Sequence, residues 1–283
     1  MQKLTYTNSA GDTAVFAIGA PYVMGHFDGA GELDAEVFTV SGIGIDGAID
    51  VGAVLEPREL TIEGTLYSKE DRADMYGLRI ALGKAMNPKH SGILVYENDA
   101  GRWRILARPR RLPVCGVRRK EHIPFVAYFT CAKPFWEDVN PTVVRLGDRV
   151  GGLRLPFRLP FRLAQSYGTR DIENTGHVST PIYVEFLGKA AAPSLTNLTT
   201  GEKIKIERPL AEGDRLVINT EIRENFATIY RADGTEEDAT SWMSFDSSFF
   251  QLEPGINRLT YSTDEDSARN YISVTFRNRF VGV

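Results

Sequence analysis

The stretch VFTVSGIGIDGAIDVGAVLEPRELTIEGTLY, residues 37–67, determines how the first half of the chain is expected to fold. Two runs rich in β-branched residues flank Asp46-Gly47, a dipeptide typical of tight hairpin turns because it tolerates positive φ angles. We therefore predict a long β-hairpin over 37–67, with its two strands at roughly 37–45 and 51–67. Such a hairpin is long enough to act as an arm.

The segment after the hairpin has a different periodicity. Met75, Leu78, Leu82 and Met86 recur at intervals of three and four residues, which places them on one face of a helix. We predict one amphipathic helix over 68–86. Because a lone helix can bury an apolar stripe only against a neighbouring layer, the helix is expected to lie across a sheet.

The rest of the chain reads as strands and turns. Alternation such as that of Ile182, Val184 and Phe186 recurs throughout the last third, with glycine-containing turns between the strands. Prolines interrupt the stretch LRLPFRLPFRL and favour an extended connection there. The predicted fold class is all-β with one amphipathic helix. The predicted parts are an N-terminal β domain (1–140), a connecting segment (141–170) and a C-terminal β-sandwich (171–283).

Composition excludes several classes of protein. The net charge of −4 provides no overall basic field for nucleic acid. Two cysteines, Cys115 and Cys131, can build neither a disulfide framework nor a zinc site. No apolar run approaches the ~18 residues of a membrane span, and no secretory leader opens the chain. We expect a soluble protein made in the cytoplasm, without membrane insertion.

Motifs that carry chemistry are missing from the sequence. The four histidines show no metal-ligand spacing, and no nucleophile elbow or phosphate loop is visible. We predict no catalytic residues, no metal and no cofactor. Two alternatives stay open: a sugar-stacking surface around Trp242, which core packing of aromatics would also explain, and a β-rich hydrolase using acids such as Asp246 or Glu253.

Charge is distributed unevenly along the chain. Residues 4–57 contain eight acids and no Lys or Arg, whereas residues 102–120 contain eight cations and no acid. Local pairing within one domain is one interpretation, and nucleic-acid binding is another, although base-stacking aromatics are sparse in the basic run. A third interpretation is a head-to-tail interface between copies of the chain, which complementary charge would orient. The candidate interface residues are Asp46, Gly47, Asp50, Arg104, Arg108, Arg110 and Arg111.

The order of several segments resembles the siphovirus distal tail protein family. In the first half the resemblance lies in LTYTNSAGD, PYVMGHFDG, GIDGAIDVGAVLEPRELTIEGTLY, NPKHSGILVY and FTCAKPFWED. In the second half it lies in DIENTGHVSTPIYVEFLGKAAAPSLTNLTTGEKIKI, RLVINT, SFDSSFFQLEPGINRLTY and VTFRNRFVGV. These segments run in the expected order over nearly the whole chain.

The resemblance implies a structural protein and not an enzyme. It implies an N-terminal domain that forms a homohexameric ring, a galectin-like C-terminal sandwich, and a place at the distal end of a virion tail assembled in the bacterial cytoplasm. The implied partners are the tail tube protein, the tape measure protein, the tail-tip or baseplate hub and the receptor-binding proteins, with DNA only in transit through the lumen. A carbohydrate-binding module or adhesin is the alternative function.

Overall fold

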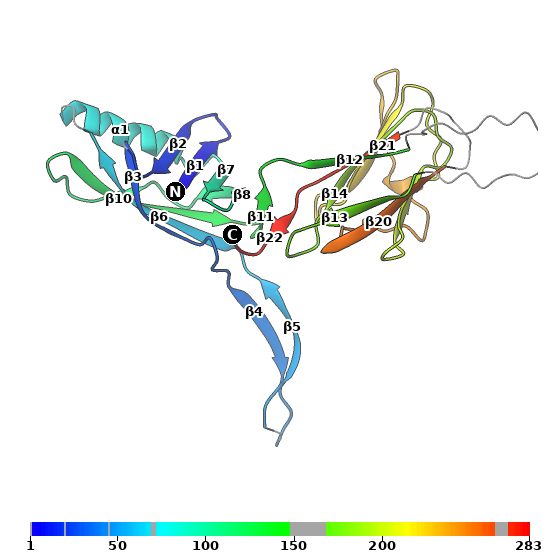
Figure 1. The fold of residues 1–283 in the computed structure, drawn as a ribbon, viewed down its shortest axis with the longest axis horizontal. Coiled ribbons are helices and arrows are strands. Elements are labelled where there is room, and N and C mark those ends of the chain that lie inside the picture. The colour runs from blue at the N-terminus through cyan, green and yellow to red at the C-terminus, as the bar shows by residue number, and fades with distance from the viewer. Residues whose placement is uncertain (1, 20, 45, 69–71, 148–167, 264–270) are drawn as a thin grey trace, which may run out of the picture. The chain divides into compact units, whose positions relative to one another are not determined.

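The chain folds into two compact units. The structure is a computed structural model that describes residues 2–19, 21–44, 46–68, 72–147, 168–263 and 271–283. The first unit comprises residues 1–139 together with 280–283, and the second comprises 140–279. The chain therefore leaves the first unit after Val139 and returns to it at Phe280 (Figure 1).

The first unit is built on a ten-stranded sheet with the order β22-β11-β8-β7-β1-β2-β3-β6-β10-β9. Since β8 also pairs with β10, the strands from β8 through β7, β1, β2, β3 and β6 to β10 close into a barrel. The strand bounds are β1 (Lys3–Asn8), β2 (Thr13–Ala17), β3 (Tyr22–Asp28), β4 (Ala35–Val40), β5 (Ile49–Leu55), β6 (Arg58–Tyr67), β7 (Gly92–Glu97), β8 (Arg102–Pro109), β9 (Val114–Cys115), β10 (His122–Cys131), β11 (Trp136–Asp138) and β22 (Arg279–Phe280).

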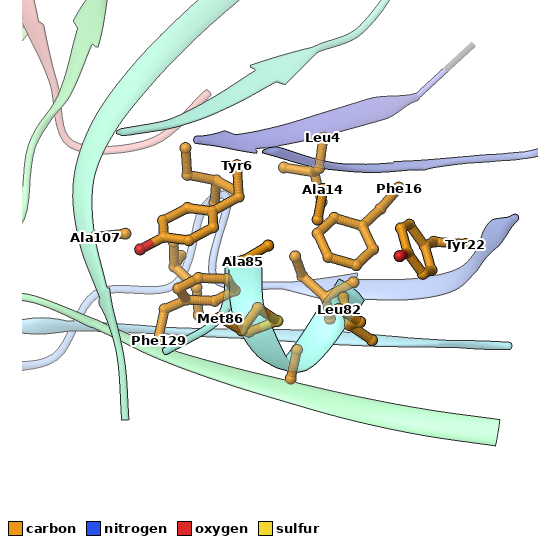
Figure 2. Packing of buried hydrophobic residues seen from close by; sticks show 14 of the residues in the cluster. Leu4, Tyr6, Ala14, Phe16, Tyr22, Leu82, Ala85, Met86, Ala107 and Phe129 are labelled. Carbon is orange, nitrogen blue, oxygen red and sulfur yellow. The ribbon is translucent and has the colours of Figure 1, made fainter. Parts of the chain in front are cut away.

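Alternating side chains fill the interior of this barrel. Leu4 and Tyr6 of β1 are fully buried, as are Phe16 of β2 and Phe129 of β10. The rings of Tyr6 and Phe129 lie 4.9 Å apart between centroids. Figure 2 shows these aromatic rings meeting the apolar side chains of the helix. Burial of this continuous apolar surface is the main stabilising contribution to the first unit.

The predicted helix is confirmed as α1 (Arg72–Ala85), which packs against β1, β2 and β6. Met75, Leu82 and Met86 are buried and Leu78 is partly buried, so the apolar stripe faces the barrel as its spacing predicts (Figure 2). Residue 68, where the predicted helix 68–86 starts, is not helical, and residues 69–71 lie outside the described residues. In the described part of the chain, no helix is long and apolar enough to span a membrane.

The predicted hairpin is shorter than 37–67. β4 and β5 form a separate two-stranded sheet, and the described residues between them, 41–44 and 46–48, belong to neither strand, so the strands do not meet in a tight turn at Asp46-Gly47. β6 is not part of this hairpin, because its alternate side chains are buried in the barrel and its backbone pairs with β3 and β10. Pro57, which lacks an N–H, separates β5 from β6. We call residues 35–55 the arm.

A buried arginine holds the base of the arm. The guanidinium of Arg58, 1% exposed, donates 2.7 Å hydrogen bonds to the carbonyl oxygens of Gly29 and Glu32, which precede the arm. It also donates to the carbonyls of Pro134, at 2.8 Å, and Val281. We call these contacts the Arg58 clamp. They join both roots of the arm to the C-terminal residues of the chain.

The second unit is a β-sandwich. A six-stranded sheet, β12-β21-β14-β17-β18-β19, and a four-stranded sheet, β13-β20-β15-β16, share one apolar core. The element bounds are β12 (Thr142–Leu146), β13 (Arg170–Asn174), β14 (Ile182–Leu187), β15 (Ser194–Asn197), β16 (Lys203–Lys205), β17 (Arg215–Asn219), β18 (Phe226–Tyr230), β19 (Glu236–Asp238), the short 3-10 helix η1 (Thr240–Trp242), β20 (Gly255–Ser262) and β21 (Tyr271–Phe276). The predicted all-β class with one α-helix is confirmed for the described residues.

The second unit begins earlier than the predicted sandwich at residue 171. Residues 142–146 were assigned to the connecting segment 141–170, but they form β12 and pair with β21. Leu146 is buried in the core of the sandwich, which explains why this short stretch is a strand. Pro156 and Pro160, on which the predicted connection rests, lie outside the described residues.

The Arg58 clamp predicts a specific loss of stability. Replacing Arg58 by Met keeps the apolar stem but leaves buried carbonyls without a donor, so we expect the first unit to lose about 3 kcal/mol or more in its free energy of unfolding. Urea denaturation followed by tryptophan fluorescence measures this change. As a control, Arg258→Met removes an exposed ion pair with Asp171 and should change the unfolding midpoint little. Equal midpoints for the two variants would contradict the assignment.

Candidate assembly interface

The arm is exposed along its described length except at Leu55, which is partly buried at the base. Residues 34–44 and 46–54 are all exposed, and β4 and β5 pair only with each other in the described part of the chain. Within the first unit, the arm projects from the barrel as a narrow ribbon (Figure 1). A hydrogen bond of 2.9 Å from the Glu56 N–H to the Asp34 carbonyl closes its base.

Exposed apolar side chains cover both faces of the arm. The pairing of Phe38 with Gly52 and of Val40 with Ile49 puts Phe38, Val40 and Ile49 on one face. Val37, paired with Ala53, lies on the other face. The exposed large apolar residues of the arm are Val37, Phe38, Val40, Ile43, Ile49, Val51 and Val54. Large apolar area of this kind on a surface element marks a contact with another molecule.

The predicted acidic residues lie at and near the tip of the arm. Asp46 and Gly47 are exposed in the tip loop, where Gly47 adopts a φ of +91° that favours glycine. The Asp50 carboxylate accepts a 3.0 Å hydrogen bond from the Gly52 N–H within β5. In the described part of the chain, neither Asp46 nor Asp50 forms an ion pair. Their charges are therefore available to another molecule.

The predicted basic residues lie along β8 and just after it. Ile105 and Ala107 of β8 point into the barrel, so the alternate residues Arg104 and Arg108 lie on the outer face. The structure gives each of the four arginines a partner within the chain. Arg104 bonds Glu137 at 3.1 Å, Arg108 donates to the Pro88 carbonyl at 2.9 Å, Arg110 bonds Glu59 at 2.9 Å, and the Arg111 guanidinium stacks 4.3 Å from the Tyr128 ring centroid.

Each of the four arginines thus has its own partner within the first unit, and among the described residues no ion pair joins them to Asp46 or Asp50 of the arm. Local pairing, the first interpretation of the charge pattern, accounts for part of the basic surface. Two features were not predicted from the sequence. The apolar exposure of the arm was not predicted because a strand pattern does not show whether another element covers the strand. The Arg58 clamp was not predicted because a single arginine in a strand gives no periodic signal.

Trp242, the predicted sugar-stacking residue, is 42% exposed in η1. The guanidinium of Arg208 lies 4.7 Å from its ring centroid and covers one face of the ring. Arg208 also lines an open depression of about 820 Å³ in the second unit. One stacking face is therefore taken by the protein itself.

That depression is lined by an ion-pair network whose polar atoms satisfy one another. Arg231 donates to the buried carboxylate of Asp214 at 2.7 Å and also bonds Glu237. The same carboxylate accepts backbone N–H bonds from Ala211 and Ala232. Burial alone would raise the pKa of Asp214, but these hydrogen bonds lower it below its usual value. The network joins two loops and has the character of a structural clamp.

The acids considered for hydrolysis have no catalytic setting. Asp246 is exposed and bonded to Lys203 and Ser244, and the hydrogen bond from Lys203 lowers the pKa of its carboxyl group. A general acid needs the opposite shift. Glu253 contacts the Asn257 side chain through its backbone. Among the described residues, no group of three or more His, Cys, Asp or Glu side chains is arranged to hold a metal ion.

Two family models match the sequence, one in each unit. Residues 11–106 match the phage tail protein RIFT-related domain, and residues 175–280 match the siphovirus-type tail component, C-terminal domain. Their order along the chain defines a structural component of a siphovirus-type phage tail. The chain belongs to the siphovirus distal tail protein family. The comparison with curated proteins gave no match.

Solved structures show the same fold. The crystal structure of the SPP1 Dit protein, described as a paradigm of the hub adsorption apparatus in phages infecting Gram-positive bacteria, is 13% identical with a TM-score of 0.70. The match covers 98% of this chain and 99% of that chain. A chain of the phage P2 baseplate in its activated conformation with Ca is 11% identical with a TM-score of 0.54, covering 100% of this chain and 99% of that chain.

The Asp214 network predicts a pH-dependent stability of the second unit. Asp214→Asn removes the charge that binds Arg231, and we expect a loss of about 2 kcal/mol at pH 7. Because the folded-state pKa of Asp214 is lowered, its contribution is present above the unfolded pKa of about 4 and is lost as the pH falls through the folded value. The difference in urea midpoint between wild type and variant should therefore shrink between pH 5 and pH 3. A difference that stays constant would contradict this.

Proposed function

We propose that copies of this chain join through their arms into a homohexameric ring at the distal end of the virion tail. The observation that carries the proposal is the arm: a two-stranded sheet with apolar side chains exposed on both faces. An isolated two-stranded sheet is marginally stable in water, and three or more strands or a packing partner are usually needed. The arm gains such a partner when a neighbouring copy covers it.

The geometry of the contact favours a ring. The arm belongs to one surface of the first unit and the basic face of β8 to another, so the contact is head-to-tail and closes when the rotation between copies divides a full turn. The acids of the arm tip and the arginines near β8 attract each other in this arrangement. Since those arginines already have partners within the chain, their charge contributes more to register and encounter rate than to affinity.

The ring would connect the parts of the tail. As in the hub and baseplate assemblies to which the similar structures belong, we propose that it links the tail tube protein to the tail-tip or baseplate hub and to receptor-binding proteins. Its lumen would pass the tape measure protein and, during infection, DNA. Assembly would take place in the cytoplasm of the bacterial host. In this role the protein acts by geometry, and no side chain performs chemistry.

Charged substitutions in the arm test the proposal. Val40→Lys with Ile49→Asp replaces an apolar cross-strand pair that is exposed in the single chain by a pair of opposite charges, so the fold of the arm should be retained. We expect the variant to stay monomeric by mass photometry while the wild type forms six-fold rings with a central hole in negative-stain images. The control Ile256→Asp changes an equally exposed residue of the second unit and should leave rings intact. Rings of normal mass from the arm variant would refute the role of the arm.

The basic face is tested separately. Reversing Arg108, Arg110 and Arg111 to Glu should weaken assembly and reverse its dependence on salt, because salt would then screen a repulsion between these residues and the acids of the neighbouring arm. The measurement is the fraction of rings between 50 and 500 mM NaCl, a range that runs from weak to strong screening on either side of the Debye length of roughly 10 Å at 0.1 M. Arg258→Glu, in the second unit, serves as the control for added negative charge. Unchanged ring formation in the triple variant would show that the charges of these arginines do not contribute to assembly.

A further inference from the structure

Helix α1 carries a second apolar stripe that faces away from the barrel. Met75 and Leu82 are buried against the core, whereas Tyr76 and Ile80, one turn apart, are 39% and 73% exposed. Gly83 continues this outer stripe at the next turn. A helix that packs on a barrel needs only its inner stripe to be apolar, so the outer one serves a different contact.

The outer stripe borders a small cavity of about 300 Å³. Its walls are Tyr76, Arg79, Ile80 and Gly83 from α1, and Leu112, Pro113 and Cys115 from the segment between β8 and β10. A Cβ atom built on Gly83 would meet nothing within 4 Å, so the glycine leaves open space there. Arg79 is the one charged residue among these walls. We call this cavity the α1 notch.

The tip of the arm has the complementary shape and charge. Ile43 is fully exposed at 106%, and Gly42 and Gly44 on either side leave its side chain free of bulky neighbours. Gly44 has a φ of +75°, which turns the chain sharply after Ile43. Asp46 lies three residues after Ile43 in the sequence. The described residues of the tip therefore present an exposed branched apolar side chain, Ile43, and an exposed carboxylate three residues further along the chain.

Building on the proposed ring, we propose that the arm tip of one copy inserts Ile43 into the α1 notch of the next copy, with Asp46 facing Arg79. A second copy is the occupant because the same chain supplies both halves with opposite charge: residues 4–57, which include the arm tip, contain no Lys or Arg, and the charged residue that lines the notch is Arg79. The six residues of β4 extend the tip about 20 Å from the arm base, a distance suited to a neighbouring subunit. An apolar anchor in a pocket is the usual centre of such a contact.

A native cysteine makes the contact measurable. Cys115 lines the notch and is partly exposed, whereas Cys131 is fully buried and out of reach of a reagent in the folded protein. Burial raises the pKa of both thiols, that of Cys131 to about 12. Full-length Ile43→Cys protein is treated with a short bis-maleimide at pH 8.5. We expect a ladder of covalent oligomers on denaturing gels, and no ladder when Cys115→Ser is added.

A cysteine placed elsewhere on the arm serves as the control for position. Val54→Cys, exposed near the base of the arm, should give no ladder with Cys115. Rings that form in Ile43→Cys protein without a ladder would overturn the insertion into the notch and leave the proposed ring standing. A wild-type protein that forms no rings at all would overturn both.

Filling the notch gives an independent test. Gly83→Met occupies the cavity without touching the core, and we expect assembly to require about tenfold more protein or worse. Gly77→Met is the matched control, since Gly77 lies on the same helix, is exposed, leaves the same open space and is outside the notch. If both variants assemble at the wild-type concentration, the notch does not receive the arm.

Discussion

The arm can exist as a free-standing element because one buried cation fixes its base. Arg58 is the first residue of β6, and its guanidinium binds carbonyl oxygens from the segment before the arm, from residue 134 and from the C-terminal residues. Without this clamp, the base of the arm would lose the hydrogen bonds that tie it to the segment before the arm and to the C-terminal residues. A charged donor that serves several buried carbonyls is among the stronger hydrogen-bonding arrangements in proteins, and it needs no carboxylate partner here.

Fixing the base makes the exposed apolar ribbon useful. A loosely attached hairpin with the side chains of Phe38, Val40 and Ile49 would collapse onto its own barrel or aggregate through its edges. A hairpin that is rigid at its root presents the same side chains in one direction, which lowers the conformational entropy lost on binding. The buried apolar core that stabilises the first unit thus lies in the barrel, whereas the apolar side chains of the arm are uncovered in the single chain. The family to which the chain belongs consists of parts of a larger machine, and an incomplete surface suits such a part.

The elements that depend on local periodicity could be predicted from the sequence. The spacing of Met75, Leu82 and Met86 defines the helix, and the alternation of Ile182 and Val184 defines a sandwich strand. Where partners are remote, the same rules failed. Alternation in β6 could not reveal that it pairs with β3 and β10, and β12 was hidden because its partner β21 lies more than a hundred residues away. The basic residues were found by composition, but their bonds to Glu137, Pro88 and Glu59 depend on tertiary neighbours.

The return of the chain at Phe280 makes the second unit an insertion. Phe280 and Val283 pack against the core of the first unit, so the first unit contains residues from the beginning and from the end of the described chain. The sandwich is inserted between β11 and β22. An inserted module attached by two neighbouring strands can be exchanged as a cassette during evolution while the barrel, its clamp and its arm remain unaltered. A peptide fused to Val283 would emerge beside Ala30, at the foot of the arm, and not from the sandwich.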